Sequence, residues 1–135
     1  MSAATQITLL LIEDDEQCAR MVIKVLTPHG FTIHHAKTGL AGLQLARSVA
    51  PQIILLDMGL PDLNGKIIAN QLRGFVSNDK RVPVVAFTAE SGARAERMAL
   101  AMGCDKFISK PIDTRTFPSQ IATIVETGCV EVSKS

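Results

Sequence analysis

The sequence contains no tryptophan and no tyrosine, and it has only five phenylalanines. Few aromatic side chains are therefore present to stack on a flavin, which disfavours a flavin-binding function. Long apolar runs are also missing, since the apolar segments fall well below the ~18 residues that indicate a membrane span. The formal net charge is only +1, from 14 basic and 13 acidic residues. No broad electrostatic field thus favours nucleic acid or anionic lipid as a partner.

Cysteine is scarce, and its spacing predicts neither disulfides nor a zinc site. Cys18, Cys104 and Cys129 are an odd number, and no two of them form a C-x-x-C motif. They lie in or beside apolar stretches, as the buried thiols of a reducing compartment do. The segment 1–6 has neither the basic region nor the apolar region of a secretory signal. We therefore expect a cytoplasmic protein.

The length of 135 residues is enough for one ordinary domain but too short for two. We expect residues 7–127 to form that domain. Residues 1–6 would be a short lead-in. Hydrophobic periodicity is lost after residue 127, so 128–135 is predicted to be a flexible tail.

Short aliphatic or β-branched runs alternate with longer segments of helical periodicity, which predicts five strand–helix units and a parallel sheet. The expected strands are 7–12, 31–35, 52–57, 82–87 and 105–109. The expected helices are 17–26, 39–49, 65–75, 92–102 and one that begins near residue 118. Pro118 sets that last boundary, because proline fits the first turn of a helix but not its interior.

Several finer expectations follow from the same pattern. Asn64 and Ser91 stand where N-caps are needed, and 77–80 is predicted to be a polar loop. The apolar faces of the first three helices are expected to include, respectively, Met21, Leu40 and Ile67.

The predicted fold is a doubly wound α/β sheet, with helices on both faces because the crossovers are right-handed. Ligands of such sheets bind at the carboxyl ends of the strands. Polar side chains follow four of these ends: Glu13 and Asp14, Asp57, Thr88, and Lys110. The sequence therefore predicts that acids, a hydroxyl and an ammonium meet at one edge.

The carboxylates of Glu13, Asp14 and Asp57 would repel one another strongly. Two such charges at ~4 Å repel by about 4 kcal/mol at an effective dielectric constant of ~20. A hard divalent cation, Mg²⁺ or Mn²⁺, would relieve this repulsion through oxygen ligands. Gly59 has no side chain to keep its carbonyl away from such an ion. A simpler alternative is that the acids of 14–16 only stabilise the N-terminus of the following helix, by ~0.3 to 1 kcal/mol each.

Asp57 is the candidate nucleophile, since a carboxylate can attack phosphorus and form an acyl phosphate. Thr88 would donate its hydroxyl to a phosphoryl oxygen, and the small Ala89 leaves room for the group to enter. Lys110 would supply a compact positive charge. Taken singly, each residue also has an ordinary structural explanation. Their joint position at consecutive strand ends is what favours one site.

The sequence resembles the receiver domains of two-component response regulators, including single-domain chemotaxis regulators. The matching segments are 10–16, 55–65, 83–89 and 107–111. This resemblance implies a flavodoxin-like fold with strand order 2-1-3-4-5. It also implies a phosphoacceptor switch with self-catalysed phosphotransfer and autodephosphorylation, in place of a turnover enzyme.

The resemblance further implies a role for each site residue. Asp57 would be the phosphoacceptor and a metal ligand together with Glu13, Asp14 and the Gly59 carbonyl. Thr88 and Lys110 would contact the phosphoryl group. The resemblance also implies a switch in which the rotamer of the aromatic residue Phe107 changes together with the position of Thr88. Pro111 would follow a cis peptide bond.

The implied phosphodonor is a sensor histidine kinase or a histidine phosphotransfer protein. The implied output is a protein target that binds the face formed by the helix 92–102, the strand 105–109 and the last helix. Two alternatives share parts of this chemistry. One is a receiver module of a hybrid kinase or of a larger regulator. The other is a phosphohydrolase of the haloacid dehalogenase type. Such enzymes carry their nucleophile in a D-x-D motif on the first strand, and this sequence lacks that motif there.

Overall fold

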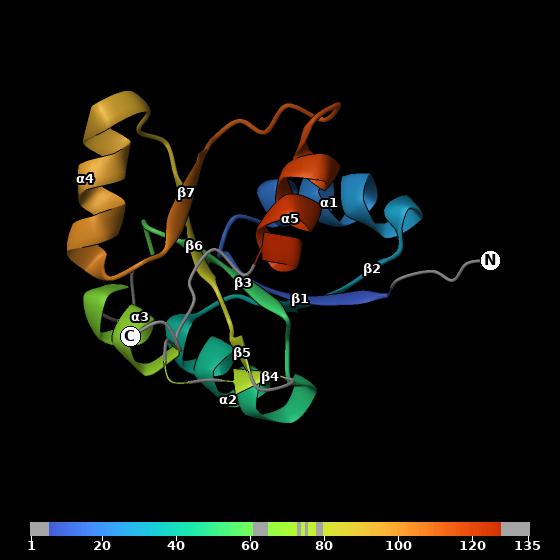
Figure 1. The fold of residues 1–135 in the computed structure, drawn as a ribbon, viewed down its shortest axis with the longest axis horizontal. Coiled ribbons are helices and arrows are strands. Elements are labelled where there is room, and N and C mark those ends of the chain that lie inside the picture. The colour runs from blue at the N-terminus through green and yellow to red at the C-terminus, as the bar shows by residue number, and fades with distance from the viewer. Residues whose placement is uncertain (1–5, 61–64, 73, 75, 78–79, 128–135) are drawn as a thin grey trace.

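The computed structural model describes residues 6–60, 65–72, 74, 76, 77 and 80–127, and strands alternate with helices along this part of the chain (Figure 1). The strands are β1 (Ile7–Ile12), β2 (Phe31–Ala36), β3 (Ile53–Asp57), β4 (Val76–Ser77), β5 (Lys80–Arg81), β6 (Val84–Thr88) and β7 (Lys106–Ser109). The helices are α1 (Glu16–Leu26), the short 3₁₀ helix η1 (Thr27–His29), α2 (Gly39–Val49), α3 (Gly65–Leu72), α4 (Gly92–Met102) and α5 (Phe117–Thr127).

Five strands form one parallel sheet in the order β2-β1-β3-β6-β7. Numbered along the chain, these strands follow the order 2-1-3-4-5. The predicted fold class, a flavodoxin-like doubly wound sheet, is therefore confirmed. The switch in strand order lies beside β1, so the carboxyl ends of β1 and β3 are where a ligand site is expected.

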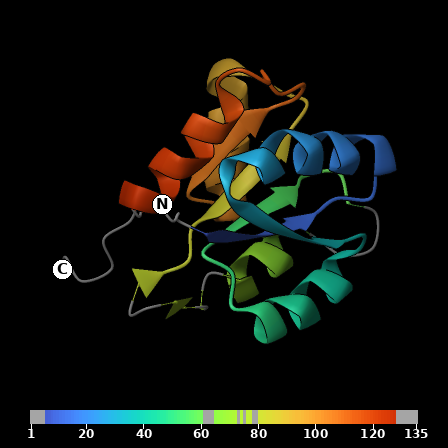
Figure 2. The same ribbon diagram turned by 90° about the vertical axis from the view of Figure 1, so that its right-hand side faces the viewer.

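Helices cover both faces of the sheet, and each face has its own hydrophobic core (Figures 1 and 2). Alternate residues of the central strands point to opposite faces, so Leu10 packs with α2, α3 and α4, while Leu11 packs with α1 and α5. The central strands are buried on both sides, which explains why they read as continuous apolar runs.

Local sequence signals fix several helix ends. The carboxylate of Asp15 caps α1 by accepting from the backbone N–H groups of Gln17 and Cys18. Gly103 ends α4 at φ 88°, a left-handed conformation that favours glycine. A turn closed by Asp113 precedes α5, which begins at Phe117 and holds Pro118 in its first turn. The expected late start of this helix is thus confirmed.

Three predicted inward residues are wrong. Met21, Leu40 and Ile67 are 48%, 57% and 51% exposed, respectively. In each helix the buried stripe lies one residue to the side, as Val22 does in α1. The helical period correctly predicted that each helix has a buried apolar face. It did not predict which residues at the border of that face are buried, because this depends on how the helix packs on the sheet.

The region before β6 also differs from the expected loop. β4 and β5 form a small antiparallel hairpin, in which Val76 pairs with Arg81. Ser91 is the N-cap residue of α4, but its side chain makes no capping hydrogen bond. The expected cap at Asn64 and the expected tail at 128–135 lie outside the described residues, as does all of the expected lead-in 1–6 except Gln6. Among the described residues, no helix has both the length and the apolar character needed to span a bilayer.

Candidate functional site

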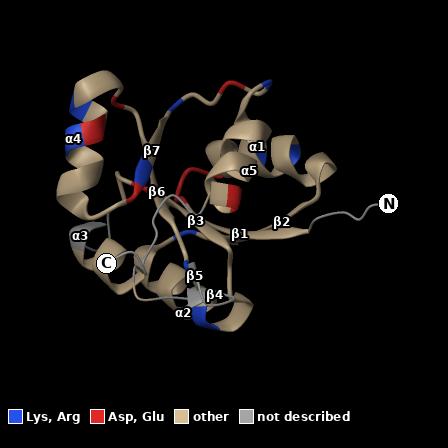
Figure 3. Cartoon of the chain, in the orientation of Figure 1, with Lys and Arg blue, Asp and Glu red and all other residues tan. Residues whose placement is uncertain are grey.

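A cluster of acidic side chains lies at the carboxyl end of the sheet. The run that begins with Glu13 continues from β1 into the start of α1 (Figure 3), and Asp57 is the last residue of β3. One carboxylate oxygen from each of Glu13, Asp14 and Asp57 lies within 4.8 Å of the others. Glu13 and Asp57 are buried, whereas Asp14 is exposed. The acidic site expected from the sequence is therefore assembled.

Lys110 is the cation of this site. Its Nζ lies 3.0 Å from Oε1 of Glu13 and 3.3 Å from Oδ1 of Asp57. Burial opposes the charged form of Lys110, but the two carboxylates outweigh it, so the pKa of the ammonium is raised. Lys110 thus stays charged and links the acid after β1 and the acid at the end of β3 to the loop after β7.

One acceptor of the cluster remains unfilled. Oε1 of Glu13 is buried and accepts no well-oriented hydrogen bond from a described residue, although the Lys110 ammonium is close enough for an ion pair. The other oxygen, Oε2, accepts from the backbone N–H of Asp15 at 3.2 Å. Hard oxygen donors with a spare lone pair suit a divalent cation such as Mg²⁺. The residues present therefore fit the metal that the sequence predicts.

Asp57 is held in a state that resists ionisation. Burial raises the pKa of its carboxyl, and the interaction with Glu13 raises it further. The backbone N–H of Gly59 donates to Oδ1 at 3.0 Å, and together with Lys110 it opposes the rise only in part. Gly59 thus contacts Asp57 through its amide. The suggested metal contact of its carbonyl remains a prediction.

Thr88 is the last residue of β6 and is buried. It lies one position beyond Phe87, the residue that pairs with Asp57 across the sheet. Its Oγ1 accepts from the backbone N–H of Glu90 at 3.0 Å, and its carbonyl accepts from the backbone N–H of Lys110 at 2.7 Å. The expected hydroxyl therefore lies at the same edge as the acids and the ammonium.

Phe107 lies in β7 opposite Ala86 and packs against the core on the α2, α3 and α4 side of the sheet. Pro111 follows Lys110 through a cis peptide bond. Ala89, beside Thr88, is exposed. The cis bond before Pro111 and the open position at Ala89 agree with the expectation, while the switch role of Phe107 remains a prediction.

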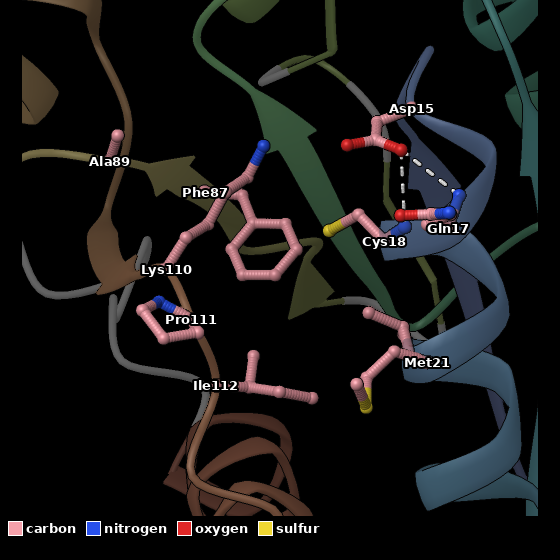
Figure 4. A pocket seen from close by; sticks show the side chains of 10 residues that line it. Asp15, Gln17, Cys18, Met21, Phe87, Ala89, Lys110, Pro111 and Ile112 are labelled. Carbon is pink, nitrogen blue, oxygen red and sulfur yellow. Dashed lines mark hydrogen bonds between the residues drawn. The ribbon is translucent and has the colours of Figure 1, made fainter.

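A cavity of about 480 Å³ opens beside the site, between the start of α1 and the loop after β7 (Figure 4). Apolar side chains line most of it, among them Met21, Phe87 and Ile112. Cys18 also lines it, and burial together with the nearby Glu13 carboxylate raises the pKa of this thiol to about 12. The thiol is therefore protonated at neutral pH and is no candidate nucleophile.

Sequence reasoning missed two neighbours of the site. The sequence pattern indicates Cys18 only as a buried thiol and Phe87 only as part of an apolar strand. The Phe87 ring lies under the Lys110 ammonium, with Nζ 5.1 Å from the ring centroid. An aromatic residue directly before the predicted Thr88 was the one signal that could have pointed to this contact.

Residues 9–122 match the family model described as "Response regulator receiver domain". Among curated proteins, the probable transcriptional regulatory protein SilR of Salmonella typhimurium is 32% identical over 127 residues, which is 94% of this chain and 54% of SilR. The chain thus spans about half the length of this relative.

Two solved structures show the same fold. A putative response regulator from Chloroflexus aurantiacus superposes with a TM-score of 0.79 at 24% identity, covering 90% of this chain and 99% of the other. The chemotaxis response regulator CheY4 of Vibrio cholerae gives a TM-score of 0.78 at 22% identity, covering 89% and 99%.

Proposed function

The chain belongs to the family of response regulator receiver domains, and we propose that it accepts a phosphoryl group on Asp57 and thereby switches a protein-binding face. Receiver domains are phosphoacceptor switches of two-component systems and not turnover enzymes, which excludes the phosphohydrolase alternative. The observation that carries the proposal is the position of Lys110, whose ammonium lies within 3.3 Å of both the Glu13 and the Asp57 carboxylates.

In the proposed transfer, a carboxylate oxygen of Asp57 attacks the phosphorus of a phosphohistidine. The P–N bond breaks, its electron pair returns to the imidazole of the donor, and a P–O bond to Asp57 forms. Lys110 balances negative charge on the phosphoryl oxygens. Thr88 donates its hydroxyl to one of them, and the exposed Ala89 leaves that side open. Hydrolysis of the acyl phosphate returns the domain to rest.

Mg²⁺, or Mn²⁺ in its place, would be held by Asp14, Asp57 and the carbonyl of Gly59, with Glu13 completing the acidic site. When bound, such an ion would offset the charge of the carboxylates and of the incoming phosphoryl group. The buried, unfilled Oε1 of Glu13 supports this assignment.

We propose that the signal leaves through the face of α4, β7 and α5. Once the hydroxyl of Thr88 turns toward the phosphoryl group, space opens behind it and Phe107 moves inward. Phe107 also lines a cavity of about 690 Å³ between β7 and α5, so its movement would reshape this face. A protein target that reads the face would then bind one state more tightly than the other.

The phosphodonor would be a histidine kinase or a histidine phosphotransfer protein, as two-component signalling requires. We assign the receiver domain to residues 7–127 and place it in the cytoplasm, where thiols stay reduced. Because the chain spans about half of SilR, membership of a larger regulator or of a hybrid kinase is equally consistent with this chemistry.

Phosphorylation can be tested with acetyl phosphate and Mg²⁺, followed by intact-mass and peptide mass spectrometry. We expect one phosphoryl group per chain, located on Asp57, and no labelling when Mg²⁺ is chelated before acetyl phosphate is added. The variant Asp57→Asn should remain unlabelled. Asp113→Asn, which removes an exposed carboxylate outside the cluster, should be labelled like the wild type. Labelling of Asp57→Asn at the wild-type level would refute the assignment.

The output face can be tested by hydrogen exchange of the same samples. We expect phosphorylation to change amide protection in residues 92–109 and in α5, and we expect Thr88→Ala to lose this change while it retains labelling. Equal responses in Thr88→Ala and the wild type would refute the proposed switch.

A further inference from the structure

The ammonium of Lys110 has an aromatic neighbour besides its two carboxylates. Its Nζ lies 5.1 Å from the centroid of the Phe87 ring, within the ~6 Å over which a ring face attracts a cation. Phe87 pairs with Asp57 between β6 and β3. The ring, the reacting carboxyl and the ammonium therefore belong to one site.

The Phe87 ring is held rigidly. It is fully buried, and it stacks on Phe117 with a centroid distance of 6.3 Å and an interplanar angle of 14°. Phe117 is itself fully buried at the first position of α5. The ring therefore cannot turn its face away from Lys110 without disturbing the core. Figure 4 shows the Lys110 side chain passing this ring in the cavity that both residues line.

Lys110 by itself is not rigid. Its ammonium ends a flexible four-carbon stem, and its side chain is 25% exposed. The carboxylate of Asp57 holds it only while that carboxylate carries a negative charge. Formation of an acyl phosphate, a mixed anhydride, bonds one of its oxygens to phosphorus and removes this carboxylate charge. The Glu13 carboxylate and the neutral, fixed ring face are two contacts of the ammonium that the transfer leaves unchanged.

We propose that Phe87 is a positioning residue that holds the ammonium of Lys110 over the reacting oxygen of Asp57. The inference rests on the function proposed above, because it names the residue that orients the cation for that same transfer. Its attraction arises from the electron-rich face of the ring. Withdrawing electrons from the ring should therefore weaken it while the packing is preserved.

The test replaces Phe87 with phenylalanines that carry one, two and three fluorines, incorporated into the full chain. The rate of Asp57 labelling by acetyl phosphate in Mg²⁺ should fall with each fluorine, by about 2- to 30-fold for the whole series. The same series at Phe117 is the matched control. That ring stacks in the same core, and we expect its fluorination to leave the rate unchanged.

A second readout does not depend on labelling. The pKa of Lys110, followed by NMR of its Cε during a pH titration, should fall with fluorination of Phe87 and not with that of Phe117. A merely structural role would not move this pKa. The variant Phe87→Leu, which keeps an apolar side chain without a ring, should resemble the most fluorinated protein in both readouts.

The outcomes separate the two proposals. A wild-type protein that acetyl phosphate does not label contradicts the function proposed above, and the NMR titration then still decides the role of Phe87. If the wild type is labelled, but the fluorinated Phe87 proteins show the wild-type labelling rate and the wild-type Lys110 pKa, the role of Phe87 alone is overturned. Equal effects at residues 87 and 117 overturn it as well.

Discussion

Lys110 and Glu13 form an ion pair, with Nζ of Lys110 3.0 Å from Oε1 of Glu13, although Glu13 follows β1 and Lys110 follows β7, two strands that are not neighbours in the sheet. The contact ties the loop after β7 to the loop after β1. One ammonium here contacts two buried carboxylates, and the exposed Asp14 belongs to the same acidic cluster. The resting site therefore carries an excess of negative charge, and the first two predictions follow from that excess.

Replacing Asp57 with asparagine should stabilise the resting protein at neutral pH without Mg²⁺. Burial and Glu13 raise the pKa of Asp57 in the folded state above the ordinary value of 3.8. A carboxyl whose pKa is raised by folding costs stability as the pH rises from that ordinary value through the folded pKa. The melting temperature of Asp57→Asn should exceed that of the wild type at pH 7. This gain should shrink as the pH falls toward 3.8. A variant that melts lower than the wild type at pH 7 would contradict the expectation.

Mg²⁺ should raise the melting temperature of the wild type by mass action. A ligand at 100 times its dissociation constant stabilises the folded state by about 2.7 kcal/mol. Asp14→Asn should lose most of this shift, because it removes the exposed carboxylate of the cluster. Asp113→Asn should keep the full shift. The melting temperatures of the wild type and the two variants are measured over a Mg²⁺ titration. A wild-type Mg²⁺ shift in Asp14→Asn would exclude Asp14 as a ligand.

Cys18 should react slowly with alkylating reagents even though it is not fully buried. Burial and Glu13 raise the pKa of this thiol from 9.0 to about 12. The thiolate fraction at pH 8 is then about a thousand-fold lower than for an unshifted thiol. Iodoacetamide labelling followed by peptide mass spectrometry should show this slowing in the native protein and its loss in urea. Glu13→Gln should restore part of the reactivity, and native rates that equal those in urea would disprove the shift.

Arg81 should contribute more to stability than the exposed arginines do. Its guanidinium donates to both carboxylate oxygens of Asp105 at 2.7 and 3.2 Å, and the Asp105 side chain is only 2% exposed. Arg81→Ala removes both of these charge-assisted hydrogen bonds from a buried carboxylate that keeps the one from the Val84 backbone N–H, which should cost about 1.5 to 3 kcal/mol of unfolding free energy. Arg115→Ala, from an exposed pair, should cost ~0 to 1 kcal/mol. Urea denaturation compares the two, and similar losses would count against the buried pair.

Gly42 should be intolerant of a side chain because α2 lies close to β1 at this point. A Cβ here would lie 2.4 and 2.7 Å from two atoms of the Ile12 side chain, which is fully buried. Gly42→Ala should therefore destabilise the protein by about 1 to 3 kcal/mol through overpacking, partly offset by its better helix propensity. At Gly74 the nearest atom would lie 3.7 Å away, so Gly74→Ala should be nearly neutral. The denaturation midpoints of both variants and the wild type test this expectation. An unchanged midpoint in Gly42→Ala would show that the Ile12 side chain repacks freely.

Much of the fold was predictable because parallel strands buried on both faces read as continuous apolar runs. The sequence reading placed β1 and α2 at their observed bounds, and Pro118 marked the late start of α5. The β4 and β5 hairpin was missed, since strands of two residues carry no periodic signal. The inward faces of helices were predicted only to within one residue, as Met21 demonstrates.

The sequence by itself determined which chemistry reaches the edge of the sheet. A polar residue directly after an apolar strand lies at that edge wherever the strand sits, which is how Asp57, Thr88 and Lys110 were found. The tertiary structure alone decided what surrounds them. The burial that raises the pKa of Cys18 and the position of the Phe87 ring under Lys110 arise from side-chain contacts made in the folded chain. Such contacts depend on side-chain direction and burial, which the spacing of residues does not encode.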